Sequence, residues 1–79
     1  MNKEILYALL DKFTTTIAYD ASDNPEYIGD ATPGSATSAA VWRIKKITWD
    51  SGNPTNIQWA SGTQNYDKIW DDRGDYVYS

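Results

Sequence analysis

The stretch of residues 40–60 constrains the fold more than any other part of this sequence. It contains a run of aromatic and β-branched residues, then Asp-Ser-Gly-Asn-Pro, and then a second run of the same kind. Two β-prone runs on either side of a turn rich in Gly, Asn, Asp and Pro are typical of a β-hairpin. The stretch also holds Trp42, Trp49 and Trp59, three of the four tryptophans. We therefore expect the other segments to pack on this hairpin or to extend its sheet.

The alternation inside the hairpin allows two arrangements. Trp42 and Ile44 share one face of a regular strand, and Ile47 and Trp49 share the other. Either both faces of the sheet are covered, or a β-bulge near Lys45-Lys46 shifts the phase, and we favour the bulge. The predicted core takes its large side chains from this hairpin and from the C-terminal part of the chain: Trp42, Ile44, Ile47, Trp49, Ile57, Trp59 and Trp70.

The segments around the hairpin add further short elements. Residues 14–20 alternate as a half-buried strand, and residues 26–29 provide a return strand after an Asp-Asn-Pro turn. Residues 30–39 lack a large apolar side chain and are predicted to form a surface loop. Residues 66–72 are predicted to form a short helical turn, and residues 75–79 a last strand. The expected fold is mainly β, a small antiparallel sheet, barrel or sandwich of about five short strands with one N-terminal α-helix.

The N-terminal segment has the pattern of an amphipathic helix. Asn2 can cap it and Glu4 lies in the first turn, where a negative charge suits the helix dipole. We expect residues 1–13 to form this helix and residues 14–79 to form one small β domain built on the hairpin 41–60. The apolar stripe either packs on the sheet of its own subunit or mediates assembly with a partner, so its residues are assembly candidates: Ile5, Leu6, Leu9, Leu10 and Phe13.

Composition limits the chemistry that is open to the chain. It has no Cys and no His, which excludes disulfides, thiolate and imidazole metal ligands, and Ser-His or Cys-His nucleophiles. A net charge of −4 argues against a nucleic-acid partner, and no apolar run reaches the roughly 20 residues of a membrane span. A chain of 79 residues forms a marginal core, and oligomerisation is one way to stabilise such a core. We expect no enzymatic activity, no cofactor and no metal.

Two groups of residues could still form sites. Asp67, Asp71, Asp72 and Asp75 cluster in the sequence, but their spacing does not fit a calcium loop, so a solvated loop is the better interpretation. The tripeptide Arg73-Gly74-Asp75 matches the one that integrin ligands display, without a supporting context.

Aromatic residues provide the remaining candidate site. Trp59, Tyr66 and Trp70 could form a platform on which a sugar stacks, although aromatic residues in so small a chain belong to the core more often. The basic residues near Trp42 are interpreted as solvated outward positions of a strand: Arg43, Lys45 and Lys46.

Several motifs follow one another in a familiar order: Tyr27-Ile28-Gly29, Pro33 to Ala40, Trp42 to Ile47, Ile57 to Ala60, and Trp70 to Arg73. Over residues 16–79 the chain resembles a group of small proteins encoded among the structural genes of tailed bacteriophages. The resemblance implies a virion component that is made in the host bacterial cytoplasm. It also implies a symmetric homo-oligomer, such as a trimer, that contacts other virion proteins, and it supplies no catalytic residues.

Two functions are therefore expected. The first is a virion structural protein, such as a tail fibre, adaptor or head decoration component, that acts by self-association and attachment to other virion proteins. The alternative is a small carbohydrate-binding module that uses exposed aromatic side chains.

Overall fold

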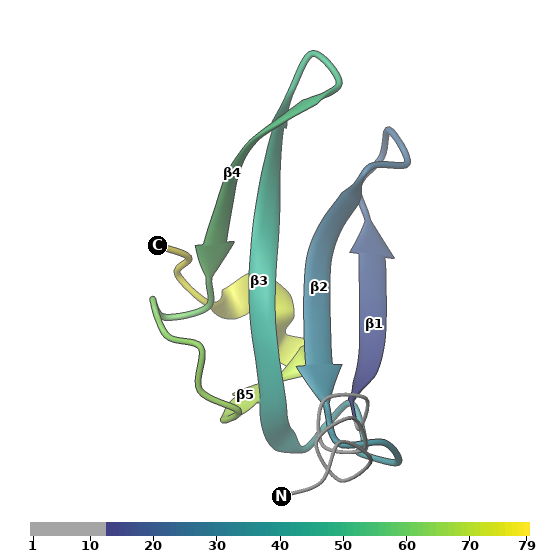
Figure 1. Ribbon diagram of the computed structural model, residues 1–79, viewed down its shortest axis with the longest axis vertical. Coiled ribbons are helices and arrows are strands. Elements are labelled where there is room, and N and C mark those ends of the chain that lie inside the picture. Colours follow the sequence, from purple (N-terminus) through teal and green to yellow (C-terminus); the bar gives the residue numbers. More distant parts are fainter. Residues whose placement is uncertain (1–12) are drawn as a thin grey trace, which may run out of the picture.

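Five β-strands make up about half of residues 13–79, the part of the chain that the computed structural model describes (Figure 1). They are β1 (Thr14–Tyr19), β2 (Pro25–Ala31), β3 (Ala40–Asp50), β4 (Asn53–Trp59) and β5 (Lys68–Ile69), and the 3₁₀-helix η1 (Trp70–Asp75) follows β5. The strands are antiparallel in the order β1-β2-β3-β4, and β5 pairs with the beginning of β3. The prediction of a mainly β, antiparallel fold is confirmed. Within the described residues the sheet stays open and does not close into a barrel.

The predicted N-terminal helix cannot be compared with this sheet. Its residues lie outside the described part of the chain, apart from Phe13, which directly precedes β1. The assembly candidates Ile5, Leu6, Leu9 and Leu10 lie outside the described residues as well.

Local turn chemistry explains both hairpins. Between β3 and β4, Ser51 and Gly52 have φ values of 52° and 84°, and two positive φ angles in a row are what a type I′ hairpin turn requires. Between β1 and β2, the Asp20 carboxylate accepts hydrogen bonds from the backbone N–H groups of Ser22 and Asn24 at 2.8 and 3.0 Å. Asp side chains commonly fold a turn in this way, so the residues at both tips select the hairpin by themselves.

The register of β3 decides how its side chains are divided between the two faces. β3 pairs residue by residue with β2 and with β4 through Lys45-Lys46, so the predicted bulge at this place is wrong. Alternation therefore continues through Lys45-Lys46, and the register shift between Thr48 and Trp49 skips Thr55 of β4, so β3 itself stays in phase there. Trp42 and Ile44 point to one face, here called the closed face, and Ile47 and Trp49 point to the other, here called the open face.

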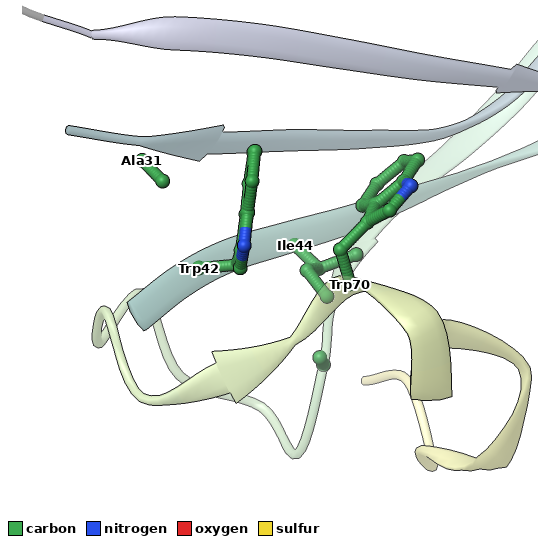
Figure 2. Close-up of a cluster of buried hydrophobic side chains, with 5 residues drawn as sticks. Ala31, Trp42, Ile44 and Trp70 are labelled. Carbon is green, nitrogen blue, oxygen red and sulfur yellow. The ribbon is translucent and has the colours of Figure 1, made fainter. Parts of the chain in front are cut away.

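The core lies on the closed face, where β5 and η1 pack against the sheet (Figure 2). Trp42 and Ile44 are 1% and 0% exposed, and the ring of Trp70 lies against Trp42 with 6.0 Å between the ring centres. Trp70 also approaches the backbone of Gly29 so closely that a Cβ there would stand 2.6 Å from its ring. The absence of a side chain at Gly29 therefore makes room for the indole. The core consists of two large indoles, one isoleucine and two alanines: Ala31, Trp42, Ile44, Ala60 and Trp70.

The last residues return along the end of β4. The backbone N–H of Trp59 donates to Ser79 O at 3.0 Å, and the N–H of Ser79 donates back to Trp59 O at 3.1 Å. Next to this contact Tyr78 forms a single β-bridge with Ala60, which is shorter than the last strand that the sequence predicts over residues 75–79. The Tyr78 hydroxyl donates to Arg73 O at 2.7 Å, which ties the C-terminus to η1. These contacts complete the cover of the closed face.

Candidate interaction surface

The open face of the sheet carries a band of apolar side chains that spans all four long strands. The cross-strand register places Ile17 opposite Ile28 on β1 and β2, and Ile47 opposite Ile57 on β3 and β4. The apolar members of the open face, taken by alternation along each strand, are Phe13, Ile17, Tyr19, Ile28, Val41, Ile47, Trp49, Ile57 and Trp59. Tyr66 joins them from the loop between β4 and β5.

Exposure separates this face from the rest of the described surface. Six of the seven exposed large hydrophobic residues belong to it: Phe13, Ile17, Tyr19, Val41, Ile57 and Tyr66. Ile57 is 60% exposed and Ile17 is 46% exposed, whereas Val77, the seventh residue, lies in the C-terminal segment. Apolar residues that are scattered singly over a surface are ordinary, but a contiguous group on one face marks an interaction site.

A stack of aromatic rings and one cation forms one end of the open face. The rings of Phe13 and Tyr66 are parallel within 6° at 5.5 Å, and the Arg43 guanidinium lies 5.0 Å from the ring centre of Tyr66 and 5.3 Å from that of Trp59. Arg43 also pairs with Asp30 at 3.0 Å. Arg43 Nε is buried and has no hydrogen-bond partner among the described residues. The arginine thus holds the β4–β5 loop against the sheet.

Lys45 brings a second positive charge onto the open face. It lies between Ile28 of β2 and Trp59 of β4 in the register, and its ammonium group is 5.6 Å from the centre of the Trp59 ring. Within residues 13–79 the ion pairs are those of Arg43 with Asp30 and of Lys68 with Asp67, so Lys45 forms none there. A surface with apolar rows around an amine favours a partner that offers apolar groups together with an acidic or aromatic one.

The structure brings together only part of the predicted sugar platform. Trp59 and Tyr66 lie on the open face, and the Arg43 guanidinium lies 5.3 Å and 5.0 Å from the centres of their rings. Trp70 is 5% exposed and lies under the closed face, on the other side of the sheet. The three rings therefore form no common stacking surface.

The predicted core divides between the two faces. Trp42, Ile44 and Trp70 lie in the buried cluster, whereas the others belong to the open face: Ile47, Trp49 and Trp59, which are half-buried, and Ile57, which is exposed. The expectation that Ile57 belongs to the core is corrected, because the register turns it away from the closed face. Sequence reasoning missed Ala31 and Ala60, since a small residue carries little sign of burial in a single sequence.

The two remaining candidates from the sequence are the acidic cluster and the Arg-Gly-Asp tripeptide. Asp67 pairs with Lys68, and the described residues contain no group of three or more His, Cys, Asp or Glu side chains that could hold a metal ion. Arg73 lies inside η1 with its guanidinium 4.7 Å from the Trp70 ring, so the Arg-Gly-Asp tripeptide is not displayed on a loop. Residues 13–79 form no pocket.

The described part of the chain also lacks a helix that is long and apolar enough to cross a membrane.

Comparison with known proteins adds no relative. The chain matches no protein-family model, and no curated protein and no solved structure is significantly similar to it. Fold and surface together define an open antiparallel β domain with one covered and one largely uncovered face.

Proposed function

We propose that this chain is a structural protein that acts by self-association and by attachment to other proteins through its open face. The gathering of exposed apolar side chains on this face, with Ile57 and Ile17 the most exposed isoleucines among the described residues, is the observation that supports the proposal. Strands about 4.8 Å apart with a rise of about 3.3 Å per residue give four strands and six residues an area on the order of 400 Å². An apolar patch on a face of this size is comparable to the largest patch of a typical monomer, which is often functional.

The proposed setting is the virion of a tailed bacteriophage, where the chain serves as a fibre, adaptor or decoration component. The ordered motifs of residues 16–79 support this setting through their resemblance to small proteins of phage structural genes. The role is one of contact and not of catalysis. A domain with so small a buried core gains stability when a partner covers its apolar face, which suits a subunit of a larger assembly.

The first experiment compares the solution mass of the full chain with that of a variant that introduces negative charges on the open face. We expect light scattering to show an oligomer for the full chain over a range of concentrations. The double variant Ile17→Glu, Ile57→Glu places two carboxylates in the apolar band and should be monomeric, with an unchanged far-UV circular dichroism spectrum.

Val77→Glu is the matched control. Within residues 13–79, Val77 is the most exposed large hydrophobic residue, at 80%, and it lies outside the open face, so this variant should keep the mass of the full chain. A full chain that is monomeric at every concentration would overturn self-association, and a double variant that keeps the oligomer would overturn the role of the open face. Mass spectrometry of purified virions, with the chain found at a fixed ratio to the major virion proteins, tests the setting.

A further inference from the structure

The two edges of the sheet differ in how well they are protected against another strand. β4 forms one edge, and the Trp59 end of this edge is occupied by Ser79 through two backbone hydrogen bonds. Pro54 near its other end has no N–H to donate. The free part of this edge is therefore restricted to residues 55–58.

β1 forms the opposite edge, and among residues 13–79 no segment pairs with its outer side. All six residues of β1 pair with β2, with one register shift between Ala18 and Tyr19 where Glu26 of β2 is skipped, so β1 itself carries no extra residue (Figure 1). Its sequence, Thr-Thr-Thr-Ile-Ala-Tyr, contains no charge, no Pro and no Gly. Natural sheets guard their edges with charged residues, Pro, bulges or a covering segment. A six-residue strand of high β-propensity without charge or Pro is a template for pairing with another strand.

We infer that β1 pairs edge to edge and antiparallel with β1 of a second copy of this chain, about a two-fold axis perpendicular to the sheet. The inference rests on the proposed function, and it names the partner and the strand. The two sheets then form one continuous sheet of eight long strands.

A second copy fits this edge better than an unrelated strand for two reasons. An antiparallel pair of identical strands is self-complementary, so one unguarded strand supplies both halves of a two-fold interface. Directly opposite residues point to the same face, so odd-numbered residues of one copy meet odd-numbered residues of the other. Ile17 and Tyr19, which are 46% and 56% exposed, then gain apolar neighbours across the axis, and the two open faces merge into one surface.

The absence of cysteine from the sequence allows a direct test by disulfide scanning in the full chain. Single cysteines are placed at the centre of β1 by Thr15→Cys, Thr16→Cys, Ile17→Cys and Ala18→Cys. The matched controls are Asn56→Cys and Gln58→Cys on the free part of the β4 edge. Opposite residues in an antiparallel pair have Cα atoms about 4.5–5.5 Å apart, which a disulfide can span.

We expect one central position of β1 to form the covalent dimer at least about tenfold faster than either β4 control under mild oxidation, since only residues next to the axis meet their own copies. Equal rates at all positions would indicate random collisions and would overturn the inference. An oligomer whose β1 cysteines do not cross-link, or a trimeric mass, would overturn β1 pairing and leave the role of the open face intact. A chain that is monomeric at all concentrations would overturn both proposals.

Hydrogen exchange of the unmodified chain gives a second readout that does not depend on any substitution. Backbone amides of β1 that point away from β2 should exchange more slowly as the protein concentration rises, because pairing gives them an acceptor. Amides of residues 55–58 should show no such change. Concentration-independent exchange in β1 would contradict the pairing.

Discussion

The two faces of this sheet come from the same four strands, but they are filled in different ways. The closed face alternates large and small side chains, so that Trp42 and Ile44 stand beside Gly29 and Ala31 and leave room for Trp70. The open face carries β-branched and aromatic side chains on every strand and two cations on β3. Close packing on one face and an apolar band on the other show that apolar alternation alone does not make a core. A face becomes a core when another segment is shaped to cover it.

The largest effect on folding is expected on the closed face. Trp42→Ala removes a side chain that is 1% exposed and leaves a cavity next to Ile44 and Trp70. Such a truncation costs about 3–5 kcal/mol, which is most of the stability of a small domain. Urea unfolding followed by circular dichroism measures the loss. A loss of less than about 1.5 kcal/mol would mean that the closed face is not the main core.

Overpacking of the same face should have the next largest effect. Gly29→Ala places a Cβ 2.6 Å from Cε3 of Trp70, so the indole has to move, at a cost of about 1–3 kcal/mol. Gly74→Ala is the matched control, because a Cβ there meets no atom within 4 Å, and it should stay within about 0.5 kcal/mol of the wild type. Equal urea midpoints for the two variants would contradict the close approach of Trp70 to β2.

On the open face, the contacts of Arg43 with Asp30 and with the aromatic rings should contribute more to folding than the exposed apolar side chains. Arg43→Met removes the ion pair with Asp30 and both ring contacts, with an expected cost of about 1–3 kcal/mol. The double variant Arg43→Met, Asp30→Asn should recover part of this cost, because it no longer leaves the Asp30 carboxylate without its partner. A double variant that is less stable than the single one would argue against the pair.

Tyr78 should make the stability of the folded domain depend on pH. Burial, and then the neighbouring Tyr27 and Tyr76, raise the pKa of the Tyr78 hydroxyl well above its usual value of 10.0, while Arg73 acts weakly in the other direction. The folded state thus holds this proton more tightly than the unfolded state. Its contribution to stability is complete below pH 10 and is lost as the pH rises above that value.

Urea midpoints measured between about pH 8 and about pH 11 test this dependence. In Tyr78→Phe the decline above pH 10 should become shallower, because the group that titrates is gone. The same variant loses the hydrogen bond to Arg73 O and should be less stable by about 1 kcal/mol at neutral pH. Equal slopes for the variant and the wild type would contradict the assignment to Tyr78.

The smallest effect on the folding of a single subunit is expected at Ile57. Ile57→Thr keeps a β-branched residue at a position that is 60% exposed, so the free energy of unfolding at low protein concentration should change by less than about 0.5 kcal/mol. At high concentration the variant should gain less thermal stability than the wild type, because it buries less apolar surface in an assembly. A large loss at low concentration would place Ile57 in a core.

Local chemistry in the chain was enough to predict the hairpins and their turns. The bulge that we favoured near Lys45-Lys46 is absent, whereas Ser51-Gly52 and Asp20 each define a turn of their own. These features depend on neighbours within a few residues, so one sequence contains all the information that they need. The mainly β, antiparallel fold followed from them.

Tertiary structure decided which face became the core. Trp42 and Trp59 look alike in the sequence, but β5 and η1 cover the first, while the second lies on the open face beside Arg43. Nothing near Trp70 in the chain indicates that its indole packs against Gly29, about forty residues earlier, where a Cβ would leave no room for the ring. Burial depends on contacts between segments that are distant in sequence, and alternation states only that two faces exist.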